Sequence, residues 1–545
     1  MGDTWPMLKF DHQHPAYPSH RQPLLARNVV ATSHPLAAQA GLRILGQGGN
    51  AVDAAIATAA AMTFLEPCAN GLGSDAFAIV WDGQQLHGLN ASGAAPQAWT
   101  PEYFKQRYGT DATSPPLRGW DAVTVPGAVG GWVALQERLG RLPFADVLAP
   151  AIEMAERGEA VPVLVQRAWA RAAQVSELTR QPGFADMFLP RGRVPEVGER
   201  FRAQGAARLL KAVAQSRGEA FYKGEIASAL AKAAREQGGA LTEADLAAYK
   251  PEWVTPLAQG FEGHTLHEIP PNGQGIAAQM ALGFLQHFDL AALPIDSAAC
   301  QHLQIEAIKL AFADLHAHVA EARHMHLPVS SLLDRDYLAR RARLIDPRRA
   351  QHFGPGTPPK GGTIYLSAAD ASGMMVSFIQ SNYMGFGSGV VLPEWGLSLQ
   401  NRGHGFSLDA AHPNVVAPGK RPFHTIIPGF LSSNGQPQMS FGVMGGHMQP
   451  QGHVQTLVRM LCHRQNPQVA CDAPRWRFEH GLSLSLEQGA PEALRTGLAA
   501  LGHQLTDITD PGQFGAGQFI WRDDAHGGGY IAASDPRRDG AAVGF

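Results

Sequence analysis

Apolar residues recur at helical spacing in the first part of the chain. The run at residues 35–45 ends at a glycine-rich stretch, residues 46–49, and Asn50 then caps an alanine-rich segment. We therefore predict two consecutive helices separated by a glycine stop. The same periodicity, with flanking Pro or Gly, predicts further helices near residues 276–287, 298–322, 452–464 and 491–501.

Strand-like runs of β-branched and apolar residues occur at three places. One is Phe77–Trp81, and the other two are residues 363–370 and 374–381, which a three-residue turn joins. This last pair is the clearest hairpin signal in the chain. Together the strands and long helices indicate an α+β architecture with two layers of each.

A Pro/Gly-rich stretch, HFGPGTPPKGG, occupies residues 352–362. Such a segment forms neither a regular helix nor a central strand. It predicts an exposed connection that ends abruptly at Thr363.

Composition and charge exclude several classes of protein. Lys and Arg number 44 against 47 acids, with a net charge of -3, and no basic block is present, so we expect neither nucleic acid nor a membrane surface as a partner. The longest low-charge stretch, Ala54–Leu65, is too short to span a bilayer and predicts a core helix. No secretory signal is recognisable at the start of this sequence, so the expected location is cytoplasmic.

The cysteines and histidines give weak signals for metal. The four cysteines lack CxxC spacing and are predicted to be buried thiols, Cys68, Cys300, Cys462 and Cys471. The densest histidine cluster is His316, His318, His324 and His326 with Asp314. Asp314 and His318 share a helix face, which leaves a metal site there as an alternative, but packing or surface roles are favoured and no metal is predicted.

Other familiar catalytic signatures are missing from the sequence. It contains no GxSxG elbow, SxxK, HExxH or Walker loop. The glycines at 46–49 follow a predicted helix rather than a strand, so they indicate a helix C-cap and not a dinucleotide loop.

Thr363 is a candidate nucleophile because it directly follows the linker. A threonine at a newly freed N-terminus carries its own general base, because its α-amine has a pKa of roughly 7.7–8.0 and lies within reach of its hydroxyl. Gly361 and Gly362 precede it and permit the backbone conformation in which the Thr363 hydroxyl attacks the Gly362 carbonyl. Self-cleavage between Gly362 and Thr363 is therefore predicted.

Motifs from about residue 29 to residue 544 resemble the γ-glutamyltranspeptidase family. The first half carries ATSHPLAAQAGLRILGQGGNAVDAAIA, GLGSDAFAIVWDG, AVTVPGAVGGW and AIKLAFAD. The second half carries TIYLSAADASGMMVSFIQSNYMGFGSGVV, LQNRGHGFSLD, APGKRPFHTIIPGF, MGGHMQPQGHVQ, DAPRW and SDPRRDG. So many motifs in the family's order make chance similarity very improbable.

The resemblance implies an N-terminal-nucleophile hydrolase with an αββα four-layer sandwich. It implies a precursor that splits into a large subunit, residues 1–362, and a small one, residues 363–545, which together form one interleaved domain and are expected alone or as a dimer of the pair. The nucleophile falls on Thr363, and the residue that hydrogen-bonds it on Ser381. The oxyanion hole falls on Gly445 and Gly446, which by themselves are typical of a tight turn.

The substrate positions depart from the family pattern. Ser92 stands where classical members have an arginine, and Arg402 and Gly405 stand where they have Gln and Asp. Without an acid at Gly405, discrimination for an α-ammonium group should be weak, whereas the Arg402 guanidinium suits a carboxylate. A structural ion pair is the alternative role for Arg402. The remaining predicted substrate-binding residues are Asn382, Tyr383, His424 and Thr425, the last two in place of paired serines.

These observations predict a self-cleaving amidase or acyltransferase that needs no metal or organic cofactor. Its family-default substrate is glutathione or another γ-glutamyl compound; the alternative is a small acidic amide, as in the divergent branch that includes oxamate amidohydrolase and cephalosporin-acylase-like enzymes. His447 stands where that branch often has Asp. Two alternatives from other classes are an uncleaved relative that only binds a ligand and a zinc-dependent amidohydrolase built on the histidine cluster.

Overall fold

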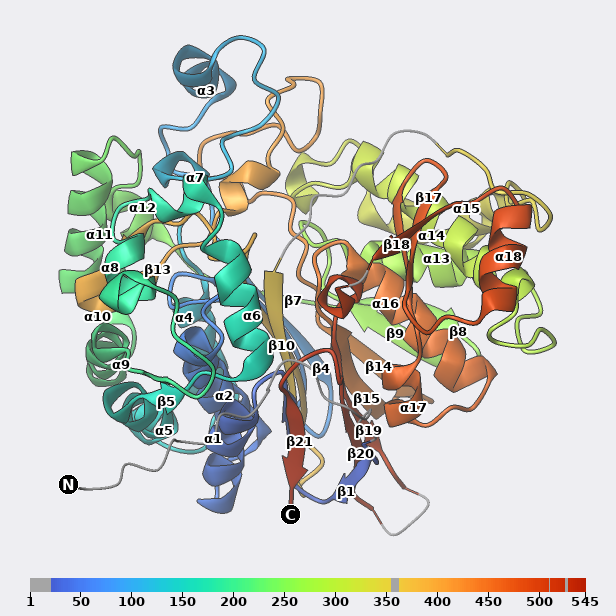
Figure 1. Cartoon of the computed structure of the whole chain (residues 1–545), viewed down its shortest axis with the longest axis horizontal. Coiled ribbons are helices and arrows are strands. Elements are labelled where there is room, and N and C mark those ends of the chain that lie inside the picture. Colours follow the sequence, from blue (N-terminus) through green and yellow to red (C-terminus); the bar gives the residue numbers. More distant parts are fainter. Residues whose placement is uncertain (1–20, 354–361, 509, 525–527) are drawn as a thin grey trace, which may run out of the picture.

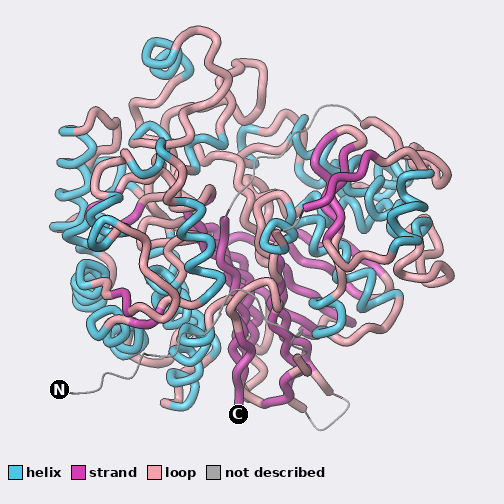
Figure 2. The backbone as a smooth tube through the Cα atoms, viewed as in Figure 1, coloured by secondary structure: helices cyan, strands magenta, loops and turns pink. Residues whose placement is uncertain are grey.

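The computed structural model describes residues 21–353, 362–508, 510–524 and 528–545. Most of the predicted linker, residues 354–361, lies outside the described residues. Figures 1 and 2 show strands gathered at the centre of the molecule with helices on both sides.

Two antiparallel seven-stranded sheets form the centre. Sheet I has the order β21 (Ala541–Gly544), β2 (Val29–Thr32), β10 (Gly362–Ala369), β11 (Met375–Tyr383), β3 (Asp75–Trp81), β4 (Leu86–Ala91) and β7 (Glu252–Val254). Sheet II has the order β1 (Leu24–Ala26), β20 (Tyr530–Ser534), β19 (Gly517–Arg522), β15 (Gln436–Val443), β14 (Gly429–Ser433), β9 (His264–Glu268) and β8 (Leu257–Phe261). The predicted hairpin is β10 and β11, at the middle of sheet I.

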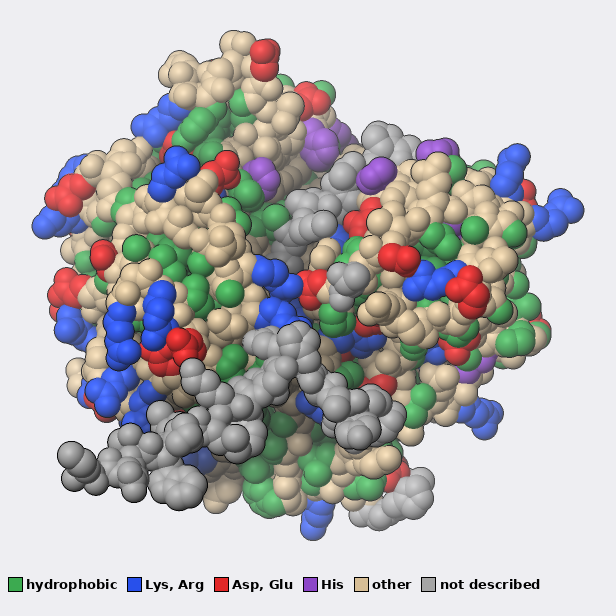
Figure 3. Space-filling model, in the orientation of Figure 1, with side chains coloured by type: hydrophobic (Ala, Val, Ile, Leu, Met, Phe, Trp, Pro, Cys, Tyr) green, Lys and Arg blue, Asp and Glu red, His purple; other side chains and the backbone are tan. Residues whose placement is uncertain are grey.

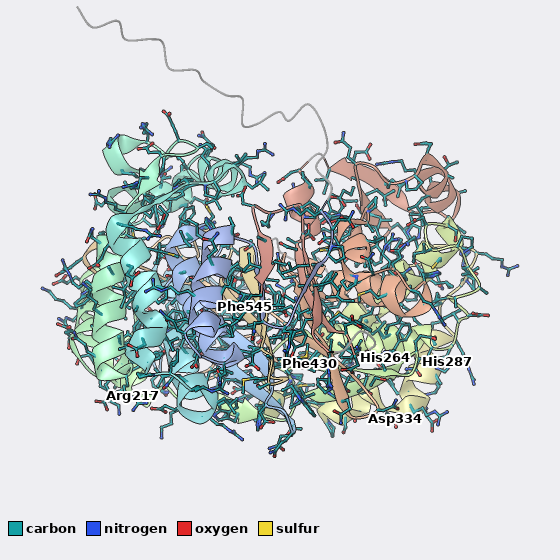
Figure 4. All side chains as sticks on the ribbon, turned by 90° about the horizontal axis from the view of Figure 1, so that it is seen from below. Arg217, His264, His287, Asp334, Phe430 and Phe545 are labelled. Carbon is teal, nitrogen blue, oxygen red and sulfur yellow. The ribbon has the colours of Figure 1, made fainter. Side chains whose placement is uncertain are left out.

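Helices cover the outer face of each sheet. Those on sheet I include α1 (Pro35–Gly46), α2 (Ala51–Leu65), α4 (Ala128–Leu139), α5 (Phe144–Arg157) and, farther out, α9 (Gln204–Ser216) and α11 (Glu225–Glu236). Those on sheet II include α13 (Ile276–Leu285), α14 (Ala298–His318), α16 (Met448–Leu457) and α18 (Glu492–Ala500). The predicted αββα sandwich is therefore confirmed. Figure 4 shows these layers from below, with the labelled Phe430 in the interior.

The smaller elements cap these layers. They are α3 (Pro101–Tyr108), β5 (Glu159–Ala160), α6 (Val163–Ala172), α7 (Ser176–Thr179), α8 (Phe184–Phe188), β6 (Arg200–Phe201), α10 (Glu219–Tyr222), α12 (Glu243–Ala248), α15 (Arg335–Ala342), β12 (Val391–Leu392), β13 (Leu397–Ser398), α17 (Pro467–Asp472), β16 (Trp476–His480), β17 (Ser483–Glu487) and β18 (Gln504–Ile508). Strands β16, β17 and β18 form a separate small sheet.

Local sequence accounts for the predicted helix ends. Asn50 accepts the N–H of Asp53, and the Asp53 carboxylate accepts the N–H of Asn50, a reciprocal cap that satisfies two N–H groups of α2. All fifteen residues of α2 are buried, because it lies between sheet I and the outer helices. The predicted helix at 452–464 begins earlier, at Met448, and its last turn, Val458–Cys462, is a π-helix.

Alternation along the strands of sheet I separates two cores. In β2, β3, β10 and β11, even-numbered residues such as Ile364 and Phe378 pack under the helices, whereas odd-numbered residues such as Tyr365, Phe77 and Ile379 pack against sheet II. Thr363 lies at the end of β10, where a shift in the β10–β11 register interrupts this alternation.

Each sheet contains strands that precede Gly362 in the sequence and strands that follow it. In sheet I, β10 and β11 lie between β2 and β3, and in sheet II, β8 and β9 extend a sheet whose middle comes from the C-terminal third. Two fragments separated at this point would thus remain held by continuous backbone ladders. Among the described residues, no helix combines the length and the apolar character needed to cross a membrane.

Candidate active site

Thr363 lies at an irregularity in the ladder between β10 and β11. Gly362 pairs with Tyr383 and Ile364 with Gln380, so two residues of β11, Ser381 and Asn382, stand opposite Thr363 alone. A bulge of this kind twists the strand and redirects side chains, and bulges are frequent beside active sites. Tyr383 ends it with a φ of 77°, a conformation that is rare for a non-glycine residue.

The Thr363 hydroxyl is buried and held by polar side chains. It donates to Ser381 Oγ at 3.3 Å, and Gln449 Nε2 donates to it at 3.4 Å. Gln449 Oε1 is itself fixed, because it accepts the N–H of Ile427 at 2.9 Å. The hydroxyl of Thr363 is therefore oriented from two sides before any substrate arrives.

Gly445 and Gly446 lie between β15 and α16, and Gly445 lines the same cavity as Thr363. Their φ angles are 119° and 63°, which favour glycine, and a Cβ on Gly445 would lie 3.1 Å from both Gly515 Cα and Met448 Cβ. Neither N–H donates to any described group. Gln274 Nε2 holds the loop by donating to the Gly446 carbonyl at 2.8 Å. Two free N–H groups in a fixed loop can stabilise an oxyanion.

Arg402 is a buried cation with unused donors. Its Nη1 donates to Thr425 Oγ1 at 2.8 Å, and its guanidinium carbon lies 4.5 Å from the centre of the Tyr383 ring. Nε and Nη2 have no hydrogen-bond partner, and no described carboxylate lies within 4.0 Å of the guanidinium. Burial lowers the pKa of Arg402 to about 10. The described residues thus supply no ion pair for the alternative, structural role.

Asp75 lies next to Ser381, which in turn stands opposite Thr363. In the register of β3 and β11 it stands opposite Ser381, on the strand next to that of Ser381. His424 Nε2 donates to Asp75 Oδ2 at 3.1 Å, and the N–H groups of Gly93 and Gly127 donate to its other oxygen. Burial raises the pKa of Asp75 to about 7, opposed by the nearby charge of Arg402.

Two cavities flank the loop that carries Gly445 and Gly446. The arginine cavity, about 530 Å³, is lined by Thr363, Gly445 and six arginines, Arg118, Arg167, Arg171, Arg477, Arg537 and Arg538. The histidine cavity, about 270 Å³, is lined by Tyr383, Gly405 and four histidines, His316, His404, His412 and His447. The nucleophile is thus reached from the arginine cavity, and the Arg402–Tyr383 stack borders the histidine cavity.

The sequence is similar to known proteins over almost its whole length. The model of the family described as Gamma-glutamyltranspeptidase matches residues 37–545. The chain belongs to the gamma-glutamyltranspeptidase family. It is therefore an enzyme, and the resemblance seen in its motifs is confirmed.

Individual members of the family are similar from end to end. The oxamate amidohydrolase proenzyme of Klebsiella pneumoniae is 37% identical over 542 residues, covering 96% of this chain and 100% of that protein. The glutathione hydrolase-like YwrD proenzyme of Bacillus subtilis is 34% identical over 535 residues, covering 95% and 98%. The crystal structure of cephalosporin acylase from Bacillus halodurans superposes with a TM-score of 0.94 at 47% identity and covers 99% of both chains.

Two of the predicted substrate-binding residues of this gamma-glutamyltranspeptidase family member are engaged with neighbours. Ser92 Oγ donates to Asn90 Oδ1 at 2.7 Å. Asn382 accepts from Ser74 Oγ at 2.8 Å and donates to Ser398 Oγ at 3.2 Å. Both side chains hold loops around the site, and direct contact with substrate stays a prediction for them.

Two residues of the site were not predicted from the sequence. Gln449 stands three residues after Gly446, a spacing that puts it in the first turn of α16. Asp75 is an acid directly before an apolar strand, DAFAIVW, and a buried carboxylate at such a position is a signal for function. The sequence positions of Gln449 and Asp75 do not show that these residues lie near Thr363.

The metal alternatives find little support among the described residues. Asp314 forms an ion pair with Arg341 at 2.5 Å and accepts the Tyr337 hydroxyl, so its oxygens are occupied. One other group, His302, Glu306 and His503, brings its ligand atoms within 4.8 Å of one another. Glu306 in that group already accepts the buried Lys309 ammonium at 2.6 Å, a cation that would repel a metal ion.

Proposed function

We propose that this enzyme cleaves its own chain before Thr363 and then hydrolyses amides whose acyl group ends in a carboxylate. The observation that carries the proposal is the buried guanidinium of Arg402, which has two unpartnered nitrogens and packs on Tyr383, the residue that pairs with Gly362. A buried cation without a partner is costly, and a substrate carboxylate would supply two charge-assisted hydrogen bonds.

Self-cleavage begins with attack of Thr363 Oγ1 on the carbonyl carbon of Gly362. The carbon–nitrogen bond breaks as the acyl group passes from nitrogen to oxygen, and the proton of the hydroxyl goes to the amine that is released. Water then hydrolyses the ester, which leaves the Gly362 carboxylate and a free α-amine on Thr363. The hydrogen bonds from Thr363 to Ser381 and from Gln449 to Thr363 favour an oriented hydroxyl for the first step.

Amide hydrolysis repeats this chemistry on the substrate. The α-amine of Thr363 takes the proton of Oγ1 as that oxygen attacks the substrate carbonyl, and later gives a proton to the departing amine. The N–H groups of Gly445 and Gly446 are suited to the oxyanion, a contribution of about 3–4 kcal/mol per donor to the barrier in comparable sites. Water then attacks the ester and regenerates Thr363.

The surroundings of Arg402 favour a short acidic acyl group without an amine. Arg402 packs on Tyr383 of β11, one strand from Thr363, and neighbouring strands lie about 4.8 Å apart. A carboxylate a few bonds from the amide would span that distance. Gly405, where family members carry an acid, has no side chain that could receive an α-ammonium group. The names of the oxamate amidohydrolase and cephalosporin acylase relatives support an acylase of this kind.

A γ-glutamyl compound such as glutathione is the second candidate. Asp75 favours it, because this acid interacts electrostatically with Arg402 and could balance an α-ammonium group. Its oxygens are already used by His424, Gly93 and Gly127, however, so the balance would be incomplete. The glutathione hydrolase-like relative in Bacillus subtilis supports this candidate.

Release of 4-nitroaniline separates the two candidates. Self-cleaved protein would be assayed with 4-nitroanilides of a glutaryl group, of a γ-glutamyl group and of a neutral pentanoyl group, and with oxamate for release of ammonia. We expect the glutaryl anilide or oxamate to give the highest kcat/KM. A γ-glutamyl preference would transfer the assignment to the second candidate, and turnover by a Thr363→Ala variant would overturn the mechanism.

Location and assembly are further parts of the proposal. One large and one small subunit, alone or as a dimer of that pair, fit the family resemblance, and the location we propose is the cytoplasm. Cell fractionation and the mass of the native protein by light scattering test the two statements.

A further inference from the structure

Gln449 presents its side-chain amide to the Thr363 hydroxyl in a fixed orientation. Its Oε1 accepts the N–H of Ile427 at 2.9 Å, so Nε2 is the atom that faces Thr363 Oγ1, at 3.4 Å. The amide nitrogen can only donate a hydrogen bond. Thr363 Oγ1 therefore lies between a group that donates to it, Gln449, and a group that accepts from it, Ser381.

The elements around Gln449 hold its side chain in place. Gln449 is the second residue of α16, which begins directly after the glycine loop (Gly445 and Gly446), and its backbone N–H donates to the Gly446 carbonyl at 3.1 Å. One turn further along the same face of α16, His453 forms a hydrogen-bonded pair with Glu268 of β9 at 2.7 Å, and both side chains are buried. The donor is thus positioned before the reaction begins.

Neutral groups form the described hydrogen bonds of Thr363 Oγ1. Figure 3 shows Lys, Arg, Asp and Glu side chains spread over the surface of the molecule, whereas Gln449 and Ser381 are uncharged and buried. A fixed dipole in a buried site acts more strongly on a nearby charge than it does in water. The direction of each hydrogen bond therefore determines which charge on Oγ1 it favours.

The charge on Oγ1 changes in opposite directions during attack and during departure. When Oγ1 attacks a carbonyl carbon, it gives up electron density, and a donor to that oxygen weakens it as a nucleophile. When the ester breaks down, the electron pair of the carbon–oxygen bond returns to Oγ1, and the same donor stabilises it. An ester oxygen is a poor acceptor, so the hydrogen bond from Gln449 becomes stronger as Oγ1 leaves, and only such a difference accelerates a step.

We propose that Gln449 is a catalytic residue for breakdown of the ester and that its amide donates to Thr363 Oγ1 as this oxygen leaves the acyl carbon. Water attacks the acyl carbon and gives a proton to the α-amine of Thr363. The bond from carbon to Oγ1 then breaks, its electron pair goes to Oγ1, and the α-ammonium group returns the proton to Oγ1. The products are a carboxylic acid and the free hydroxyl. Ser381, which accepts from Thr363, serves the attack instead.

This inference rests on the proposed function, because it assumes an ester on Thr363, and self-cleavage tests it without any substrate. Gln449→Met keeps the length of the side chain but removes its amide. The acyl group of Gly362 should still pass to Oγ1, whereas hydrolysis of the ester should slow by about tenfold or more. The chain should therefore accumulate with an ester between Gly362 and Thr363.

Hydroxylamine detects this ester, because it cleaves esters much faster than backbone amides. The purified precursor would be treated with hydroxylamine at neutral pH, and mass spectrometry of the large fragment would identify the hydroxamate that the reaction leaves on Gly362. Thr363→Ala, which cannot form the ester, gives the background of the treatment. We expect the hydroxamate in Gln449→Met at several times the amount found in the native sequence.

Three further variants complete the comparison. Gln436→Met makes the same exchange at an exposed position at the start of β15 and should behave as the native sequence does. Ser381→Ala should slow cleavage without accumulation of the ester, because it affects the attack. Gln449→Glu keeps an acceptor for the Ile427 N–H and decides the case if Gln449→Met lowers the melting temperature. Its ester should accumulate increasingly between pH 6 and pH 9, as the carboxylate ionises and can no longer donate.

Turnover provides a second readout in protein that has completed self-cleavage. With the glutaryl 4-nitroanilide, Gln449→Met should release about one 4-nitroaniline per active site in a burst and then continue slowly, with one glutaryl group on the small fragment. The burst rate should stay within about threefold of the native value, whereas the steady rate should fall by about tenfold or more.

The possible failures of this inference and of the proposed function are distinguishable. Cleavage of both Gln449 variants at the native rate without a hydroxamate would overturn the role of Gln449 and leave the proposed function intact. Intact chains without a hydroxamate in both variants would also overturn it, because the amide would then serve the attack. A native chain that remains uncleaved and hydrolyses no amide would overturn the proposed function itself.

Discussion

Thr363 donates its hydroxyl proton to Ser381 Oγ across 3.3 Å, and the same oxygen accepts the N–H of Tyr383 at 2.7 Å. The second bond ties Ser381 to the backbone of its own strand just where Tyr383 takes a positive φ. The bulge in β11 therefore fixes the position of the hydroxyl that orients Thr363. A local distortion of the hairpin is in this way coupled to the nucleophile.

Self-cleavage is the first prediction. The precursor should yield fragments of 362 and 183 residues, the second of which begins at Thr363. Thr363→Ala should leave one intact chain with no amidase activity, because both reactions need its hydroxyl. Gel electrophoresis with N-terminal sequencing of the smaller band checks this. Full activity in protein that remains a single chain would contradict it.

Ser381→Ala should slow both reactions without stopping them. The substitution removes one hydrogen bond that orients Thr363, whereas Gln449 still donates to the hydroxyl. A single neutral hydrogen bond contributes about 0.5–1.5 kcal/mol, so we expect a loss of roughly 2- to 12-fold in kcat. The rate of precursor cleavage and kcat would be measured in parallel. A loss as large as that of Thr363→Ala would give Ser381 a more direct role.

Arg402→Lys should separate catalysis from processing. Lysine keeps the charge but loses the planar fork that can bind a carboxylate through two hydrogen bonds. Loss of such a charged partner in a buried site costs about 2–5 kcal/mol, which corresponds to roughly 30-fold or more in kcat/KM for acidic acyl groups. The Gly362 carbonyl carries no carboxylate, so self-cleavage should continue.

The measurement for Arg402→Lys is kcat/KM with a glutaryl and a pentanoyl anilide, together with the melting temperature. The preference for the acidic acyl group should shrink while the melting temperature changes little. Blocked processing, or a melting temperature lowered by many degrees, would show that Arg402 is structural, and His424 would become the next residue to test.

The Michaelis constant for acidic substrates should depend on the ionisation of Asp75. Burial raises the pKa of this acid from 3.8 to about 7, so it gains its charge near neutral pH, where it interacts with Arg402. Above that pH its negative charge competes with a substrate carboxylate, and KM should rise. Asp75→Asn keeps an acceptor for the N–H groups of Gly93 and Gly127 and should flatten the rise.

The raised pKa of Asp75 also makes the free energy of unfolding depend on pH. Because the folded-state pKa of Asp75 lies above the unfolded value, the folded chain binds the proton more tightly. The contribution of Asp75 to the free energy of unfolding is full below pH about 4 and is lost as pH rises through about 7. Urea unfolding of native and Asp75→Asn protein between those pH values checks this, and a pH-independent difference between them would contradict it.

Much of the framework was predictable from local pattern. The run at residues 298–322 became α14, the hairpin at 363–381 became β10 and β11, and Asn50 caps α2 as expected. These features depend on periodicity and turn chemistry within a few residues, which a sequence displays directly. The start of α16 at Met448 was placed four residues late, because Gly452 and Pro450 weaken the helical signal there.

The sequence by itself determined the family motifs, the αββα architecture that they imply, and the candidates for nucleophile, cleavage point and oxyanion loop. Only the tertiary structure decided that Arg402 has no carboxylate partner among the described residues, that Asp75 stands beside Ser381, and that the glycine loop divides two cavities. The physical reason is sequence separation: His424 and Asp75 are 349 residues apart along the chain and 3.1 Å apart in the fold. Burial, unpaired charge and shifted pKa values arise from such distant contacts, which no local pattern contains.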